Sequence, residues 1–216
     1  MRVFELVGPI MFGPSSSHTA GACRLSRAMW QILGQPLRKA KLELHGSFRV
    51  GDSGVVNKAL VAGLLGFDTD DDRINNSHEL MEQSGIDFSF ENVSIEGAHN
   101  NTVRYTLEGD SFGFKATGAS IGGGMIEISD IGGAKVLVTG DYNTLLLFCE
   151  DTKKTAGMAE MFGLGNDDWS IETSESHDGS TKLVLFKTSH PVTDEMVSKA
   201  ASFAGVRHAS RHLRFD

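Results

Sequence analysis

The segment GPSSSHT at residues 13–19 combines three serines, a histidine and a threonine. Ser and Thr hydroxyls cap helix starts because they accept hydrogen bonds from the first free backbone N–H groups. A helix start flanked by hydroxyls also binds carboxylate or phosphate, since the helix dipole is positive there. A histidine can carry charge or transfer a proton near neutral pH. The segment is therefore either a plain helix cap or a small-anion site, and the residue types alone favour neither.

Two further polar segments are GAHNNT at 97–102 and SIGGGMIE at 120–127. The first places a histidine, two amides and a hydroxyl before an expected strand, where they could coordinate a ligand, but Asn in a plain turn is the favoured interpretation. The three glycines of the second segment permit either an anion-binding concavity of backbone N–H groups or a simple tight turn. Neither segment has the glycine spacing of a nucleotide-binding loop.

Other kinds of chemistry find little support. Cys23 and Cys149 are far apart and lack Cys-x-x-Cys spacing, so they form neither a disulfide framework nor a metal ligand set. No nucleophilic triad or carboxylate pair is evident, so we expect a partner or cofactor to supply any reactive group. One histidine is expected to be structural, His45, and four are expected at the surface: His177, His190, His208 and His212.

Composition indicates a globular protein. The chain has 216 residues, of which 40% are hydrophobic and 22% charged, and a net charge of −8. An acidic chain without a Lys/Arg cluster argues against binding to nucleic acid or anionic membranes. No apolar run approaches the roughly 20 residues of a membrane helix, and the first residues do not form a secretion signal. We therefore expect a reduced, cytoplasmic protein.

Hydrophobic periodicity predicts three helices in the first half. Residues 20–33 carry apolar side chains on one helical face and end at Gly34. Further helices are expected at 55–65 and 74–83, with a strand at 41–48 between the first two helices. The period then changes to two, which predicts strands at 88–95, 102–107, 112–117, 125–130 and 135–139.

The last third follows a β-α-β-β-α-β order, which is that of a ferredoxin-like unit. Strands are expected at 145–149, 170–174, 182–187 and 206–211, with helices at 155–162 and 193–204. The prediction is an α+β protein with an α/β domain at 1–139 and a ferredoxin-like domain at 140–216.

Several motifs together resemble a known family. VGPIMFGPSSSHTAGACRL is followed, in order, by HGSF, ALVAGLLGFDTDDDRI, HNNT and GASIGGGMIEI. This series resembles the β chain, or β domain, of iron–sulfur-dependent L-serine dehydratases over about residues 3–130. The C-terminal part resembles, more loosely, the ACT domain that ends the β chain of two-subunit members.

The resemblance implies an ammonia-lyase of amino-acid catabolism and gluconeogenesis that converts L-serine to pyruvate and ammonia without pyridoxal phosphate. It implies a [4Fe–4S] cluster held by three cysteines of a partner α chain, and we expect a dimer of heterodimers. The first domain would be similar to the allosteric substrate-binding domain of phosphoglycerate dehydrogenase.

The same resemblance indicates which residues form the site. It also implies that this chain provides no metal ligand. His18 and His99 are expected to be catalytic. The expected substrate-binding residues are Ser15, Ser16, Ser17, Thr19, Asn101, Ser120, Gly122, Gly123 and Gly124.

The chain also departs from the family pattern. Where the family has a Gly-His-Gly-Thr-Asp segment, the His, Thr and Asp positions are Gly54, Val56 and Asn57. Asn100 replaces a proline, and Lys154 replaces a glycine common at ligand-binding turns of ACT domains. These changes leave open another β-substituted amino acid as substrate. They also leave open a non-catalytic, small-molecule-binding or regulatory subunit, or a subunit whose polar loops only stabilise assembly.

Overall fold

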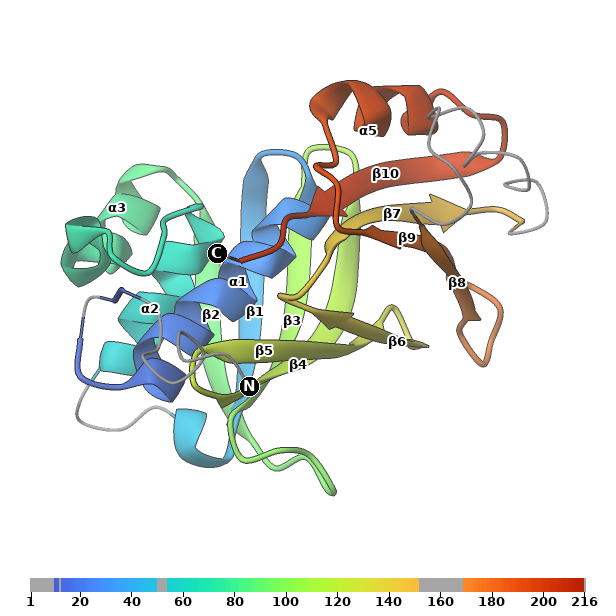
Figure 1. Ribbon diagram of the computed structural model, residues 1–216. Coiled ribbons are helices and arrows are strands. Elements are labelled where there is room, and N and C mark those ends of the chain that lie inside the picture. Colours follow the sequence, from blue (N-terminus) through green and yellow to red (C-terminus); the bar gives the residue numbers. More distant parts are fainter. Residues whose placement is uncertain (1–9, 12, 50–53, 152–168, 216) are drawn as a thin grey trace.

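The computed structural model describes residues 10–11, 13–49, 54–151 and 169–215. The chain forms two β-sheets with helices packed on them, as the predicted α+β class requires (Figure 1). The helical elements are η2 (Ser16–Ala20), α1 (Gly21–Leu33), η3 (Gly46–Phe48), α2 (Val55–Leu64), η4 (Asp72–Asn76), α3 (Ser77–Gln83) and α5 (Asp194–Ala201). The strands are β1 (Leu37–His45), β2 (Asp87–Val93), β3 (Thr102–Gly109), β4 (Gly113–Gly122), β5 (Met125–Ile131), β6 (Ala134–Thr139), β7 (Asn143–Cys149), β8 (Ser170–Glu175), β9 (Lys182–Thr188) and β10 (Val206–His212).

The first sheet has six strands in the order β2-β1-β3-β4-β5-β6. Strands β1 and β2 are parallel, and α2, η4 and α3 form the crossover that a parallel pair needs. The other neighbours are antiparallel. This arrangement brings the end of β1, the start of β3 and the end of β4 together. Leu44 of β1 pairs with Val103 of β3, and Thr102 of β3 pairs with Ala119 of β4.

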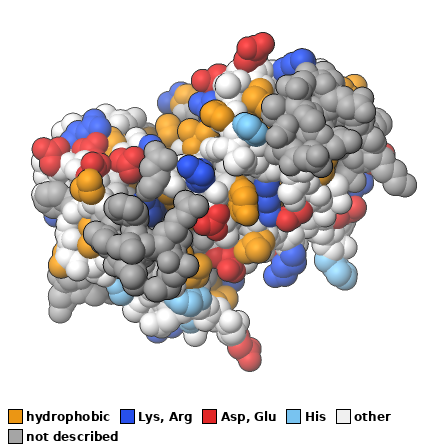
Figure 2. All heavy atoms as spheres, viewed as in Figure 1, with side chains coloured by type: hydrophobic (Ala, Val, Ile, Leu, Met, Phe, Trp, Pro, Cys, Tyr) orange, Lys and Arg blue, Asp and Glu red, His pale blue; other side chains and the backbone are white. Residues whose placement is uncertain are grey.

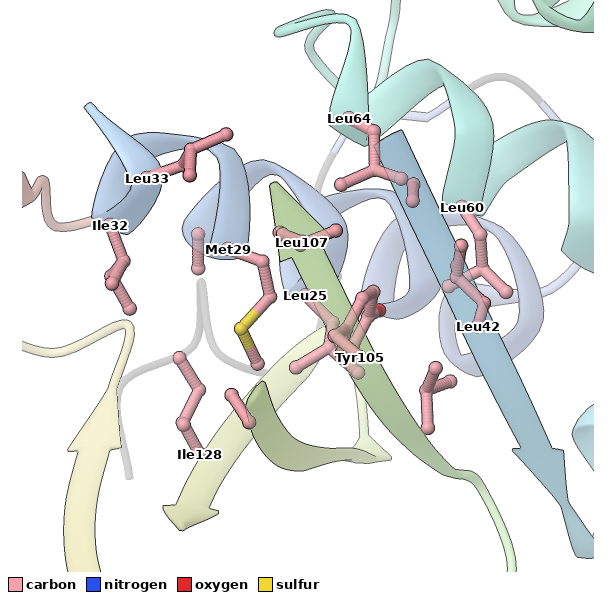
Figure 3. Close-up of a cluster of buried hydrophobic side chains, with 14 of the residues drawn as sticks. Leu25, Met29, Ile32, Leu33, Leu42, Leu60, Leu64, Tyr105, Leu107 and Ile128 are labelled. Atoms are coloured by element: carbon pink, nitrogen blue, oxygen red, sulfur yellow. The ribbon is translucent and has the colours of Figure 1, made fainter. Parts of the chain in front are cut away.

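Helix α1 lies across one face of this sheet, with α2 beside it (Figure 1). The predicted face of α1 is correct, since Ala22, Leu25, Met29 and Ile32 are all fully buried. Figure 3 shows Leu25 and Met29 packed among side chains of the strands and of α2. The helix ends where Gly34 adopts a φ of +63°, as the sequence indicates. The core of the first sheet therefore fixes the position of α1, and with it the GPSSSHT segment at its start.

The second sheet has the order β10-β7-β9-β8 and is antiparallel throughout. Both faces of β7 are buried, which explains its continuous apolar run. Leu145 and Leu147 face a cluster beneath α5, whereas Leu146 and Phe148 join the core of the first sheet. The helix expected at residues 155–162 falls outside the described residues.

The two sheets contact each other directly. The ring of Phe112, between β3 and β4, stacks on His208 of β10 with centroids 3.9 Å apart. His212 is fully buried, and its ring nitrogens lie 3.0 Å from Gln31 Oε1 of α1 and from the Thr139 carbonyl. The expectation that His208 and His212 are surface residues is therefore wrong, because both fill the contact between β10 and the first sheet. The boundary at residues 139/140 stays a prediction.

Three local predictions need correction. The strand expected at 41–48 begins earlier, at Leu37, and ends at His45, because Gly46 turns the chain with a φ of +61°. The helix expected at 74–83 starts as a 3₁₀ turn at Asp72 and becomes α-helical only from Ser77. The strand expected at 112–117 extends to Gly122, so Ser120 lies in a strand.

On the face that Figure 2 shows, acidic and basic side chains are intermixed.

Candidate functional site

The GPSSSHT segment forms the start of the long helix. Ser15 is extended, and its Oγ accepts a hydrogen bond from the His18 backbone N–H at 3.1 Å. Residues 16–20 form a single π-type turn that leads into α1. Ser15 is thus a helix cap, and the positive end of α1 with the turn before it faces the surrounding polar groups.

Four sequence segments meet at this helix start in one hydrogen-bonded series, which we call the polar cluster. It comprises the side chains of Ser15, His18, Ser47 and Asn101 and the backbone carbonyl of Ser120. Ser15 Oγ lies 3.3 Å from His18 Nδ1, and Ser47 Oγ lies 3.1 Å from His18 Nε2. Ser47 Oγ in turn donates to Asn101 Oδ1, and Asn101 Nδ2 donates to the Ser120 carbonyl at 3.2 Å. The fold therefore brings together residues more than 100 positions apart in the sequence.

The bonding partners fix the direction of each hydrogen bond. Asn101 donates through its amide nitrogen to a carbonyl, so its Oδ1 must accept from Ser47. The Ser47 hydroxyl, having donated its proton, accepts from Nε2–H of neutral His18. His18 Nδ1 then accepts from the Ser15 hydroxyl. Neutral His18 therefore carries its proton on Nε2 and is held at both nitrogens by serines.

Backbone shape holds the segments together. An added Cβ on Gly46 would lie 2.2 Å from the Asn100 carbonyl oxygen, which instead accepts a 2.8 Å hydrogen bond from the Ser47 N–H. Only glycine permits this approach. The Ser120 N–H donates to the Asn101 carbonyl at 3.1 Å, so the ends of three segments are joined through the main chain. The sequence around HGSF thus serves to place Ser47 beside Asn101.

Two buried hydroxyls at this helix start have no partner among the described residues. They are Thr19 Oγ1 and Ser120 Oγ, and both residues are at most 1% exposed. Ser120 Oγ faces the start of α1, because an added Cβ on Gly21 would lie 2.0 Å from it. Buried polar groups without partners cost stability, so their retention is typical of a functional site.

The other predicted site residues border the polar cluster. Ser16 and Ser17 lie half-buried in the first turn, and exposed His99 accepts from the Asn101 N–H at 3.1 Å through Nδ1. His99 therefore positions the Asn101 backbone in this structure. Successive φ values of +109°, +61° and +80° turn the chain between β4 and β5 at Gly122, Gly123 and Gly124.

Ser47 and Arg24 are two further site residues that the sequence pattern did not predict. Ser47 was noticed only as part of the HGSF motif, and its partners lie 29 and 54 positions away, so no local pattern identifies it. Arg24 lies one turn into α1, donates from Nη1 to the Gly124 carbonyl at 3.2 Å and packs over the Phe215 ring. It ties the glycine turn to the helix.

The altered segment lies beside the site. Gly54 precedes α2 with a φ of +57°, and Asn57 is buried within that helix. Helix α2 contacts the turn at 16–20. Lys154 lies outside the residues that the structure describes.

Neither cysteine is placed to bind iron. Burial raises the pKa of Cys23 to about 12 and that of Cys149 to about 11, and the two thiols lie in different hydrophobic clusters, so they do not form one ligand set. Across the described ranges, no group of three or more His, Cys, Asp or Glu side chains is arranged to hold a metal ion.

Comparison with known proteins identifies the family. The sequence profile of the family "Serine dehydratase beta chain" matches residues 2–130. The chain belongs to the serine dehydratase β-chain family. It is similar to the "Probable L-serine dehydratase, beta chain" of Bacillus subtilis, with 30% identity over 94% of each chain. It is also similar to the "L-serine dehydratase, beta chain" of Peptoniphilus asaccharolyticus, with 40% identity over 67% of this chain and 66% of the relative.

The family match spans the whole polar cluster, since its members all lie between residues 15 and 120.

The described helices include none that is long and apolar enough to cross a membrane.

Proposed function

We propose that this chain is the β subunit of a two-chain, iron–sulfur-dependent L-serine dehydratase that converts L-serine to pyruvate and ammonia. The observation that carries the proposal is the polar cluster, because it joins four of the five family motifs at one helix start. The two relatives are both named β chains of L-serine dehydratase, which supports a partner α chain. A dimer of such heterodimers, located in the cytoplasm, completes the proposal.

The proposed chemistry removes the carbon-3 hydroxyl and the carbon-2 proton of serine, and water then releases ammonia from the resulting enamine. The start of α1 and the unpaired hydroxyls of Thr19 and Ser120 bind the substrate carboxylate. Ser47 and Asn101 orient the amino group. His18 moves a proton through its Nδ1 or Nε2 atom, where serines already hold the ring.

A [4Fe–4S] cluster, when bound in the partner chain, supplies a Lewis acid for the substrate hydroxyl. The described residues of this chain do not fit its ligation, because both cysteines are buried thiols in different hydrophobic clusters. The proposal therefore assigns this chain to substrate binding and proton movement, and it assigns iron ligation to the partner.

We further propose that residues 140–216 form an ACT-type unit. The strand order β10-β7-β9-β8, with α5 between β9 and β10, supports this assignment. The first sheet with its helices on one face supports the likeness of residues 1–139 to the substrate-binding domain of phosphoglycerate dehydrogenase.

The test is to co-express this chain with the α chain from the same organism and to purify the complex without oxygen. Pyruvate release from L-serine is then measured for the complex and for each separate chain. We expect release only from the complex. Release by this chain alone at the rate of the complex would contradict the two-chain proposal.

A silent complex would contradict L-serine as substrate, and other β-hydroxy amino acids are then tested in the same assay. Calorimetric titration of L-serine into the lone chain distinguishes the alternative. Micromolar binding without any turnover in the complex would identify a sensor or regulatory subunit rather than half of an active site.

A further inference from the structure

A polar cavity lies where the two sheets meet, and the proposed reaction does not use it. Its volume is about 860 Å³. Its walls come from β3 and β4, from the turn between β5 and β6, from the turn between β8 and β9, and from β10. None of its lining residues belongs to the polar cluster.

Three basic side chains line this cavity from three different strands. Arg104 of β3 and Lys115 of β4 come from adjacent strands of the first sheet, and Arg207 comes from β10 of the second. Among the described residues, neither Lys115 nor Arg207 has a carboxylate within ion-pair distance, and Arg104 lies 3.6 Å from Glu43. Because Asp130 and Asp178 also line the cavity, its wall carries one net positive charge, in a chain whose net charge is −8.

The two carboxylates in the cavity wall accept hydrogen bonds from residues of their own turns. Asp130 Oδ1 accepts from the Gly133 N–H at 3.0 Å. Asp178 Oδ1 accepts from the hydroxyls of Ser176 and Ser180 at 2.6 and 2.8 Å, and these bonds lower the pKa of Asp178 to about 2. Among the described residues, neither carboxylate lies within ion-pair distance of Arg104, Lys115 or Arg207, so both hold their charge through their own turns.

Packed aromatic rings and a hydrogen-bonded guanidinium form part of the cavity wall. The stacked rings of Phe112 and His208 and the ring of Phe148, 4.7 Å from Phe112, form an apolar side. Arg207 Nη2 donates to the Ser180 carbonyl at 3.2 Å, which holds the guanidinium at the cavity wall and leaves its other N–H groups available. Guanidinium and ammonium groups that converge on a concave surface recognise multivalent oxyanions.

We propose that this cavity binds a small metabolite with two or more carboxylate or phosphate groups, at a site separate from the substrate site. Such an anion would contact the first sheet through Arg104 and Lys115 and the second through Arg207. Because it would bridge the two sheets, its binding would stabilise their contact.

The test uses calorimetric titration of the full chain at low ionic strength, with citrate as the carboxylate probe and pyrophosphate as the phosphate probe. We expect millimolar or tighter binding of at least one probe. Substitutions Lys115→Met and Arg207→Gln should each weaken this binding about tenfold, because each removes one charge-assisted contact. Lys135→Met is the matched control, since this exposed lysine lies on neighbouring β6 but outside the cavity, and it should leave affinity unchanged.

Amide chemical shifts of the unmodified chain locate the site independently of any variant. We expect the bound probe to shift Gly132, Gly133 and Ser180. Shifts confined to residues 15–19 would overturn the proposal, because the anion would then occupy the helix start instead. Absence of binding by both probes, or equal weakening by Lys135→Met, would also overturn it.

Discussion

His18 lies at the centre of the polar cluster, with one serine at each ring nitrogen. In the complex, His18→Asn retains an amide near the Nδ1 position and His18→Gln retains one near Nε2, yet neither amide transfers protons. We expect both variants to assemble and to release pyruvate about 10²–10⁴-fold more slowly. If either variant keeps turnover within about tenfold of the unmodified complex, His18 positions groups but moves no proton.

Ser120 should show opposite effects on stability and activity. Its hydroxyl is buried without a partner in the described part of the chain, so Ser120→Ala removes an unpaired polar group. We expect the free energy of unfolding to rise by about 1 kcal/mol, as measured by urea denaturation. The same variant should raise the KM for L-serine, because the hydroxyl is proposed to bind the substrate carboxylate. A less stable Ser120→Ala with unchanged KM would contradict that role.

At the scale of elements, α1 approaches β4 so closely that Gly21 has no room for a side chain. An added Cβ would lie 2.0 Å from Ser120 Oγ. Gly21→Ala should therefore destabilise the chain by about 1–3 kcal/mol, measured by denaturant unfolding. In a Ser120→Gly background the penalty should shrink, because the obstructing side chain is gone. If Gly21→Ala destabilises the chain equally in the Ser120→Gly background, contact with the Ser120 side chain is not the cause of the destabilisation.

Element positions were largely predictable, whereas their junctions were not. The spacing of Leu25 and Met29 predicts α1 because one buried face dictates its period. The strand predicted through residue 48 ends at His45 because the Asn100 carbonyl, 54 positions from Gly46, requires a turn there. Ser47 could not be predicted as a site residue for the same reason, since its role depends on contacts that only the tertiary fold creates.

At the scale of the whole molecule, His212 couples the contact between the sheets to pH. Burial lowers the pKa of His212 to about 4 from the usual 6.5, because its charged form is poorly solvated there. Protonation therefore favours the unfolded chain, so stability is complete above pH 6.5 and declines as the pH falls towards 4. The loss reaches about 3 kcal/mol.

His212→Asn should remove most of this pH dependence between pH 6.5 and 4, as followed by urea denaturation at each pH. A smaller dependence remains because burial also lowers the pKa of His208 in the same contact. His177→Asn is the control, since His177 is exposed in the turn between β8 and β9. It should keep the dependence of the unmodified chain. An undiminished slope in His212→Asn would show that other groups cause the pH dependence. Sequence reasoning placed His212 at the surface because nothing local marks a histidine that packs against a distant helix.

The most direct test of the central claim is pyruvate release from L-serine by the complex carrying Ser47→Ala. Ser47 is exposed, so its loss should leave the fold intact, and it links His18 to Asn101. We predict a fall in kcat/KM of at least about tenfold, whereas Ser202→Ala, at an exposed serine after α5, should match the unmodified complex. Unchanged kcat/KM in Ser47→Ala would contradict the claim that the four segments of the polar cluster form one substrate site.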